Sequence, residues 1–141
     1  SALAVLDDGR VPCNNDLLPA NFIDDGKKIW LIDYEYSGNN DACFELGNIW
    51  SEAKLPISAL EELVTAYYGS TRPEKLARAW LFALLAKYGW TLWASIQSSV
   101  SDIDFDFWQW GMEKFEDVEE SFASDKFERA LTQVTQKSLL L

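Results

Sequence analysis

The chain has no histidine and only two cysteines, Cys13 and Cys43, among its 141 residues. Zinc in proteins is bound mainly by cysteine and histidine at short spacings, so a zinc site is not expected. Basic residues are also few, because 12 Lys and Arg stand against 23 Asp and Glu and leave a net charge of -11. A nucleic-acid partner is not expected either, since binding to a phosphate backbone needs basic patches.

Long apolar runs are missing as well. No stretch reaches the length of about 18 apolar residues that a transmembrane helix needs, and no secretory signal peptide is recognised. We therefore expect a reduced, cytoplasmic protein. Hydrophobic residues are plentiful at 48%, and aromatic residues make up 14% with seven Trp. This composition predicts a single folded domain with a buried core rather than a disordered chain.

Apolar residues at helical spacing dominate the chain after Asn40, and a hairpin pattern precedes them. The hairpin is expected to pair residues 21–23 with 29–32 around the turn at Asp24-Asp25-Gly26. Helices are predicted over residues 42–53 with Asp41 as N-cap, 56–69, 74–99, 103–123 with Ser101 or Asp102 as N-cap, and 125–138. The resulting fold class is mainly α with a small β-hairpin, built around the long, buried helix over 74–99.

Three polar residues, Asp16, Asn21 and Asp33, flank this hairpin. The hairpin would bring Asn21 and Asp33 to the same end, where an amide oxygen and a carboxylate could hold one magnesium ion. Asp16 would lie near a hydroxyl that attacks a nucleotide phosphate. The alternative is that Asp16 and Asn21 only stabilise turns, as Asp and Asn often do. A role in turns would be enough to explain any two of these residues. The presence of all three on one loop and hairpin favours the magnesium site.

Aromatic residues form a second pattern. Trp90 and Trp93 lie one turn apart on one predicted helix, and Phe107 and Trp110 do the same on the next. A short connection makes these helices antiparallel neighbours, so the four rings can converge. Ring faces with a nearby carboxylate bind quaternary ammonium groups. The alternative is that the rings belong to the hydrophobic core, as aromatic residues at helical spacing usually do.

The stretch from Cys13 to Glu35 resembles the catalytic loop and metal-binding segment of the kinase-like small-molecule phosphotransferases. These include the aminoglycoside phosphotransferases and the choline/ethanolamine kinases, and they share the protein-kinase pattern H-R-D-x-x-x-x-N followed by D-F-G. The resemblance implies that Asp16 is the catalytic base, and that Asn21 and Asp33 bind Mg²⁺ on ATP. Asn14 stands where the family has a histidine that props the loop through hydrogen bonds, and an Asn amide can also donate and accept.

Two further stretches are similar to the choline/ethanolamine kinases in particular. They are DYEYSGNNDACFELGNIWSE, from Asp33 to Glu52, and GWTLWASIQSSVSDIDFDFWQW, from Gly89 to Trp110. The similarity implies that Glu52 opposes the substrate ammonium. It also implies a cage of four rings, namely Trp90, Trp93, Phe107 and Trp110. Eukaryotic relatives commonly have Tyr at the last two positions, so this chain keeps the ring faces and loses the hydroxyls.

The resemblance implies that residues 1–141 form one domain, the C-terminal lobe of a kinase-like phosphotransferase that binds substrate and magnesium. An N-terminal ATP lobe, with its Gly-rich loop and Lys, is absent from this chain and is the expected protein partner. The expected activity is transfer of the γ-phosphate of ATP to the hydroxyl of choline or ethanolamine, a step in phospholipid precursor metabolism. The alternatives are a kinase for another hydroxylated amine, such as an aminoglycoside, and a degenerate, non-catalytic lobe that binds amines.

Overall fold

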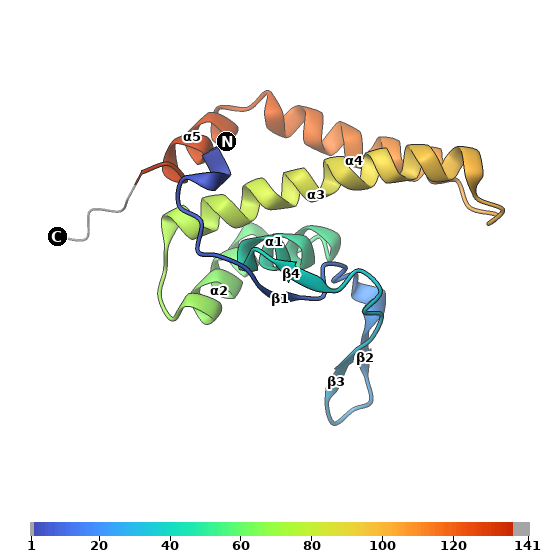
Figure 1. Ribbon diagram of the computed structural model, residues 1–141, viewed down its shortest axis with the longest axis horizontal. Helices are drawn as coiled ribbons and strands as arrows, with labels where there is room; N and C mark the ends of the chain where they lie inside the picture. The colour runs from blue at the N-terminus through green and yellow to red at the C-terminus, as the bar shows by residue number, and fades with distance from the viewer. Residues whose placement is uncertain (1, 137–141) are drawn as a thin grey trace.

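The computed structural model describes residues 2–136 and is mainly helical, with two small antiparallel sheets (Figure 1). Short 3-10 turns η1 and η2 span Ala2–Ala4 and Pro19–Asn21. The strands are β1 (Val11–Cys13), β2 (Phe22–Asp24), β3 (Ile29–Leu31) and β4 (Gly38–Asn40), and the helices are α1 (Ala42–Glu52), α2 (Ile57–Tyr68), α3 (Pro73–Val100), α4 (Phe107–Phe122) and α5 (Asp125–Gln133). The predicted fold class is confirmed.

The predicted helices all form, and two of their ends differ from the prediction by more than one residue. Helix α4 begins at Phe107 rather than 103, because Asp106 is the N-cap and its carboxylate accepts from the Gln109 amide at 2.9 Å. Ser101 or Asp102 was the wrong cap, and residues 101–106 form the loop between α3 and α4. Helix α5 ends at Gln133, earlier than the predicted Ser138, which lies outside the described residues.

Helix α1 is fixed at its start and in its middle. Asp41 is the N-cap, as predicted, and its carboxylate also accepts from buried Arg78 of α3 at 2.6 Å and 3.0 Å. At Gly47 an added Cβ would lie 2.2 Å from the backbone oxygen of Ala79, so α1 crosses α3 where only glycine fits. This contact sets the position of α1 under the long helix.

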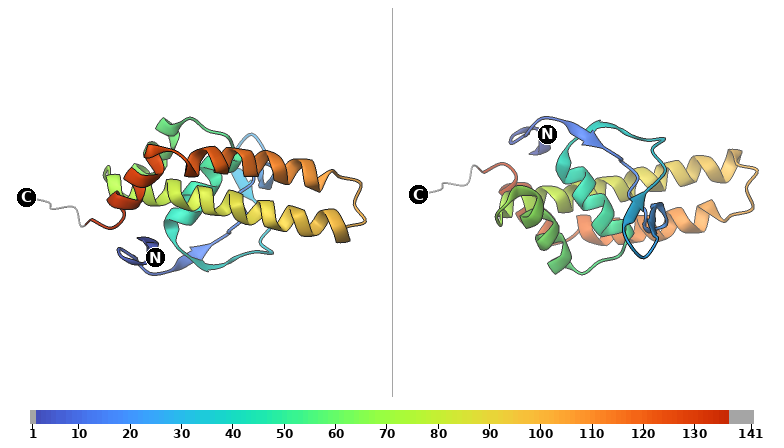
Figure 2. Two further views of the ribbon diagram at one scale, coloured as in Figure 1. Left: turned by 90° about the horizontal axis from the view of Figure 1, so that it is seen from above. Right: turned by 90° about the horizontal axis from the view of Figure 1, so that it is seen from below.

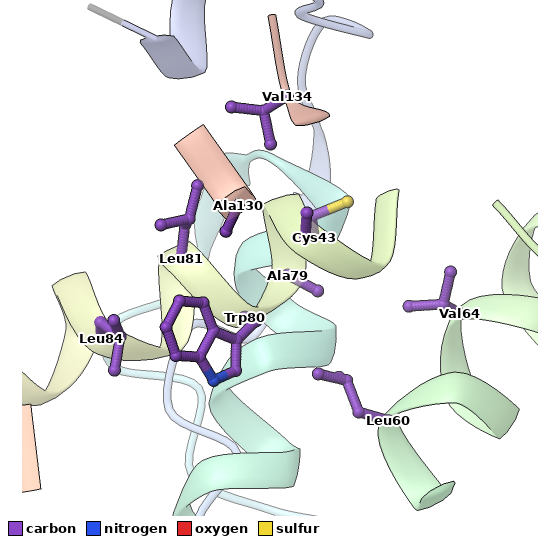
Figure 3. Close-up of a cluster of buried hydrophobic side chains, with 10 residues drawn as sticks. Cys43, Leu60, Val64, Ala79, Trp80, Leu81, Leu84, Ala130 and Val134 are labelled. Carbon is purple, nitrogen blue, oxygen red and sulfur yellow. The ribbon is translucent and has the colours of Figure 1, made fainter. Parts of the chain in front are cut away.

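The main hydrophobic core lies where α3 meets α1, α2 and α5 (Figure 3). Trp80 and Leu84 of α3 contribute large side chains, and Leu60 of α2 is fully buried in the same cluster. Both cysteines are free and buried, and burial raises the pKa of the Cys43 thiol to about 11. This end of α3 is therefore the structural core, and the other end is left for the site.

Helices α3 and α4 form an antiparallel pair that extends beyond the rest of the body (Figure 2). The two helices approach closely at Gly111, where an added Cβ would lie 2.8 Å from the Cβ of Ala94. The predicted antiparallel packing is confirmed. Although α3 is long, no helix in the described residues is long and apolar enough to cross a membrane.

The hairpin of β2 and β3 is confirmed, with Phe22 opposite Leu31 and Asp24 opposite Ile29. A second pair was missed: β1 pairs with β4, and Cys13 lies opposite Gly38. The segment Gly38–Asn40 was interpreted as part of a polar connection, because Gly and Asn are turn formers. Its pairing with β1 places the loop that follows Cys13 directly beside the start of α1.

Candidate active site

The loop after β1 is bound to helix α1 by two charged hydrogen bonds. The backbone amides of Asn14 and Asn15 donate to the two carboxylate oxygens of Glu45, at 2.7 Å and 3.0 Å. The side-chain amide of Asn48 donates to the Asn15 carbonyl at 3.3 Å. Hydrogen bonds to an ionised acceptor are short and strong, so α1 holds this loop rigidly in place.

Asn14 joins the two acidic positions of the predicted site. Its Nδ2 donates to the Asp33 carbonyl at 2.8 Å, and its Oδ1 accepts from the Asp16 amide at 2.9 Å. Asn14 is buried, so these bonds are shielded from water. An asparagine at this position therefore connects the loop to the end of the hairpin by using both ends of its amide.

Asp16 is buried, with 7% of its surface exposed. Burial raises the pKa of its carboxyl above the ordinary value, and the negative charges of Asp33 and Glu52 raise it further. Among the described residues, nothing donates a hydrogen bond to its Oδ1. A buried carboxylate without a donor is unfavourable for stability, and such groups are typical of functional sites.

Asn21 and Asp33 lie at the base of the hairpin, as predicted. The Ile32 amide donates to the Asn21 carbonyl at 3.0 Å, which places Asp33 next to Asn21 across the hairpin. Asn21 donates from Nδ2 to the Asp16 carbonyl at 2.9 Å, so its side-chain oxygen remains available to accept or to coordinate. Asp33 is exposed and has a φ of 62°, a left-handed conformation that is uncommon outside glycine and that Asp and Asn adopt more often than most other residues.

These two residues provide the hard oxygen donors that magnesium prefers. No three His, Cys, Asp or Glu side chains gather into a metal-binding group within residues 2–136. Asn21 and Asp33 together offer one amide oxygen and one carboxylate, and an ion held by so few protein oxygens would keep several water or phosphate ligands.

The four predicted aromatic residues converge between α3 and α4. Ring centroids lie 5.6 Å apart for Trp90 and Trp93 and 5.6 Å apart for Trp93 and Phe107, and Trp110 lies 6.1 Å from Trp93. All of these pairs are edge-to-face, a favourable arrangement for aromatic rings. Phe107 is buried, whereas the three Trp rings are only half-buried, so part of their surface faces a cavity.

That cavity has a volume of about 470 Å³ and opens beside Asp16. It is lined by Asp16, Leu18, Glu35, Tyr36, Trp90, Trp93, Ile103, Asp104, Phe105, Phe107 and Trp110. Carboxylates and ring faces therefore share one hollow. The volume falls in the usual range for small-molecule sites.

Several of these lining residues were missed as site residues. Tyr36 packs edge-on against Trp90 at 6.1 Å, although it follows the hairpin and is far from the helices in the chain. Glu35 and Asp104 add negative charge to the cavity wall. The only sequence signal was the alternation of acidic and aromatic residues in DYEY and in DIDFDF, which alone does not predict a shared cavity.

Glu52 does not line the aromatic cavity. It lines a second cavity of about 660 Å³, and Trp110 lines both cavities. Its carboxylate is 7% exposed and accepts from the Lys114 ammonium at 2.8 Å and 3.0 Å. The structure thus places Glu52 close enough to Asp16 to affect its pKa, but already paired with a cation.

Comparison with known proteins agrees with this geometry. The model of the "Choline/ethanolamine kinase" family matches residues 4–75. "Ethanolamine kinase 2" of Rattus norvegicus is 33% identical over 134 residues, covering 80% of this chain and 35% of the relative. "Protein LicA" of Haemophilus influenzae is 40% identical over 60 residues, covering 43% of this chain and 18% of that protein. The chain spans about a third of the length of the ethanolamine kinases it matches.

Solved structures share the fold. A choline/ethanolamine kinase family protein from Mesorhizobium loti has a TM-score of 0.87 and 32% identity, over 95% of this chain and 46% of that chain. An ethanolamine kinase from Plasmodium vivax has a TM-score of 0.68 and 26% identity, over 86% of this chain and 35% of that chain. Because the family model covers half of the sequence and the backbone agrees over nearly all of it, the chain belongs to the choline/ethanolamine kinase family.

Proposed function

We propose that this chain is the substrate- and magnesium-binding part of an ATP-dependent phosphotransferase that acts on the hydroxyl of choline or ethanolamine. The observation that carries the proposal is the shared cavity, in which Asp16 and the half-buried Trp rings line the same wall. A small amino alcohol has its hydroxyl and its amine a few bonds apart. One molecule can therefore place its amine against the rings and its hydroxyl at Asp16.

The aromatic rings would bind the amine. Each ring face attracts a cation by roughly 0.5–2 kcal/mol, depending on desolvation. Glu35 and Asp104 lie in the same wall and add negative charge. Trp93 contacts both Phe107 and Trp110, so it is central to this group.

Asp16 would orient the hydroxyl and accept its proton. A carboxylate with a raised pKa is a stronger base than an ordinary one, and burial is what raises it here. The backbone of Asp16 is held by Asn14 and Asn21, which keeps the carboxylate in a fixed position. Positioning of this kind can supply a large part of the rate acceleration in phosphoryl transfer.

Asn21 and Asp33 would hold magnesium through the Asn21 side-chain oxygen and the Asp33 carboxylate. When bound, the ion would neutralise the charge on the ATP phosphates. Asn14 contributes by tying the Asp33 carbonyl to the Asp16 loop, so that base and metal ligands keep a constant separation.

The test of the amine site is a calorimetric titration of this chain with choline and with ethanolamine. Trp93→Ala should abolish the binding that the parent chain shows. Trp30→Ala is the matched control, because Trp30 lies on the hairpin and donates to Asp25, outside the cavity. Binding that survives Trp93→Ala would show that the rings are ordinary core.

The test of transfer is phosphorylation of choline, ethanolamine and kanamycin by ATP and Mg²⁺. It should be run on the chain alone and with the N-terminal lobe of a family member supplied. We expect transfer to the amino alcohols and none to kanamycin, because the cavity is small and aromatic. Amine binding without transfer in both arms would instead support a non-catalytic amine-binding lobe.

A further inference from the structure

Helix α3 carries an apolar stripe on the side that faces away from α1. Ala79 and Ala83 form the side that meets α1 at Gly47. On the other side, exposed apolar residues recur every three or four positions, at Leu85, Tyr88, Leu92, Ile96 and Val100. In the left view of Figure 2, α3 and α4 lie side by side across the rest of the body. The stripe is therefore a long apolar surface that the described part of the chain leaves open to solvent.

The same part of α3 has no charge. From Tyr88 to Ser101 the sequence contains no Asp, Glu, Lys or Arg, although 25% of the whole chain is charged. More than half of these residues are exposed. An exposed helix face normally carries charged residues, whereas the centre of a protein–protein interface is depleted of them. This half of α3 therefore has the composition of an interface.

Helix α4 adds two large side chains to this surface. Phe122 lines one small hollow together with Leu85, so both lie on the same side of the helix pair. Trp108 precedes Phe122 by about four helical turns and thus lies on the same side of α4. Trp108 is 58% exposed and Phe122 is 41% exposed. We call the α3 stripe with these two residues the outer face.

The outer face is large enough for a stable contact. Its seven side chains are about half exposed, and at about 150–250 Å² for each when fully exposed they present roughly 600–900 Å². The largest apolar patch on a typical monomer covers about 300–600 Å². Each partner in an interface of standard size buries about 800 Å². The area thus agrees with what a stable protein contact needs.

The spacing of the stripe indicates which partner fits. Tyr88 and Ile96 lie one turn before and after Leu92, and Leu85 and Val100 lie two turns before and after it. A second α3 packed antiparallel on this one would set Leu92 opposite its own counterpart and Tyr88 opposite Ile96 of the partner subunit. Such self-complementarity is what a two-fold interface requires.

We propose that the outer face binds a second copy of this chain, in a two-fold dimer with Leu92 at the axis. The inference goes beyond the proposed function and does not depend on it. None of the seven residues lines the aromatic cavity, so the contact does not use the residues proposed to bind the amine.

Two other kinds of partner fit this surface less well. A lipid surface is disfavoured because Asp102, Asp104 and Asp106 lie in the loop at the end of the helix pair, whereas helices that bind at membrane surfaces are rich in Lys and Arg. A basic protein would be attracted to the acidic parts of the chain, and the uncharged stripe offers it no opposite charge.

The first experiment measures the mass of the chain by sedimentation, from micromolar to submillimolar concentration and at low and high NaCl. We expect a monomer–dimer equilibrium that salt strengthens, because two copies of net charge -11 repel each other outside the apolar contact. Leu92→Glu should raise the dissociation constant by about 100-fold or more, since two like charges would meet at the axis. Ile29→Glu is the control, because Ile29 is 66% exposed on β3, outside the outer face, and should leave the constant unchanged.

A second experiment tests the position of the axis. Leu92→Lys should be as monomeric as Leu92→Glu. An equimolar mixture of the two variants should form a dimer again, because opposite charges then meet where like charges met before. A variant that had lost its fold would not regain a dimer on mixing, and circular dichroism of each variant alone checks the helical content.

Four results would overturn the inference, and all of them leave the proposed function standing. The first is a parent chain that stays monomeric at every concentration and salt level. The second is a dimer that Leu92→Glu does not weaken, which would place the contact elsewhere. The third is a mixture of the Glu and Lys variants that stays monomeric, which would exclude Leu92 from a two-fold axis. The fourth is a monomer that binds phosphatidylcholine vesicles and loses this binding in Leu92→Glu, which would assign the outer face to lipid.

Discussion

The Asp16 loop and the aromatic cavity lie side by side but are built by different forces. The loop is held by a few directional hydrogen bonds, chiefly from Glu45 and Asn14. The cavity is held by the packing of rings and by the close approach of α3 and α4 at Gly111. A single substitution can remove a directional hydrogen bond completely, whereas packing energy is spread over many contacts. Substitutions in the two regions should therefore have different signatures.

The largest effect is expected in the loop, from Asp16→Asn. The amide keeps the shape of the side chain but cannot accept the proton, so phosphoryl transfer should fall by about a hundredfold or more. Amine binding should change little, since the rings remain. Asp24→Asn, on an exposed carboxylate of the hairpin, is the control. Equal loss of binding and transfer would indicate that Asp16 is structural.

Glu45→Gln should break the attachment of the loop to α1. A Gln offers one acceptor oxygen to two backbone donors, those of Asn14 and Asn15, so one donor loses its partner. We expect the free energy of unfolding to fall by about 1.5–3 kcal/mol, measured by urea denaturation. Glu61→Gln, on the exposed face of α2, should stay within about 0.5 kcal/mol of the parent. Similar values for both would mean that the loop is held in another way.

Gly111→Ala tests the packing that forms the cavity. Its Cβ would meet Ala94, so α4 must move away from α3 and carry Trp110 with it. The free energy of unfolding should fall by about 1–3 kcal/mol, and amine binding should weaken. Gly89→Ala is the control, because an added Cβ there meets nothing within 4 Å and should be neutral or stabilising by up to about 1 kcal/mol. Unchanged binding in Gly111→Ala would argue against a close-fitting cavity.

The smallest effect is on the pH dependence of stability. Burial raises the pKa of Asp16 in the folded chain above its unfolded value, so the folded state binds this proton more tightly. The parent is then destabilised as the pH rises from the unfolded pKa, about 3.9, through the raised folded value. Asp16→Asn should match the parent in acid and become the more stable of the two toward neutral pH. The free energies of unfolding of the parent and Asp16→Asn can be compared by denaturation at several pH values. A parent that is the more stable of the two near neutral pH would contradict the prediction.

The parts that the sequence predicts well are those governed by local spacing. The helix start at Asp41, the hairpin around Gly26 and the antiparallel α3–α4 pair depend on caps, turns and short connections. Trp90 and Trp93 lie on one helical face, and the short connection to Phe107 brings the rings together. Local rules sufficed for these features because each involves neighbours in the chain.

The features that the sequence does not predict depend on contacts between residues that are distant in the chain. The pairing of β1 with β4 joins two short strands that contain Pro, Gly and Asn, which have low strand propensity. Tyr36 reaches Trp90 only because that pairing directs the chain past α3. The bond between Lys114 and Glu52 joins α4 to α1, and neither residue carries a local signal for it.

The left-handed backbone at Asp33 has a consequence for protein engineering. Asn15 and Asp33, with φ of 68° and 62°, adopt a conformation that glycine accepts without strain. A library selected only for thermal stability would favour glycine at Asp33 and would discard the carboxylate. A position where the selection replaces a carboxylate and the protein becomes more stable is one where the original residue is not there for folding. Such a selection would identify these residues without any assay of activity.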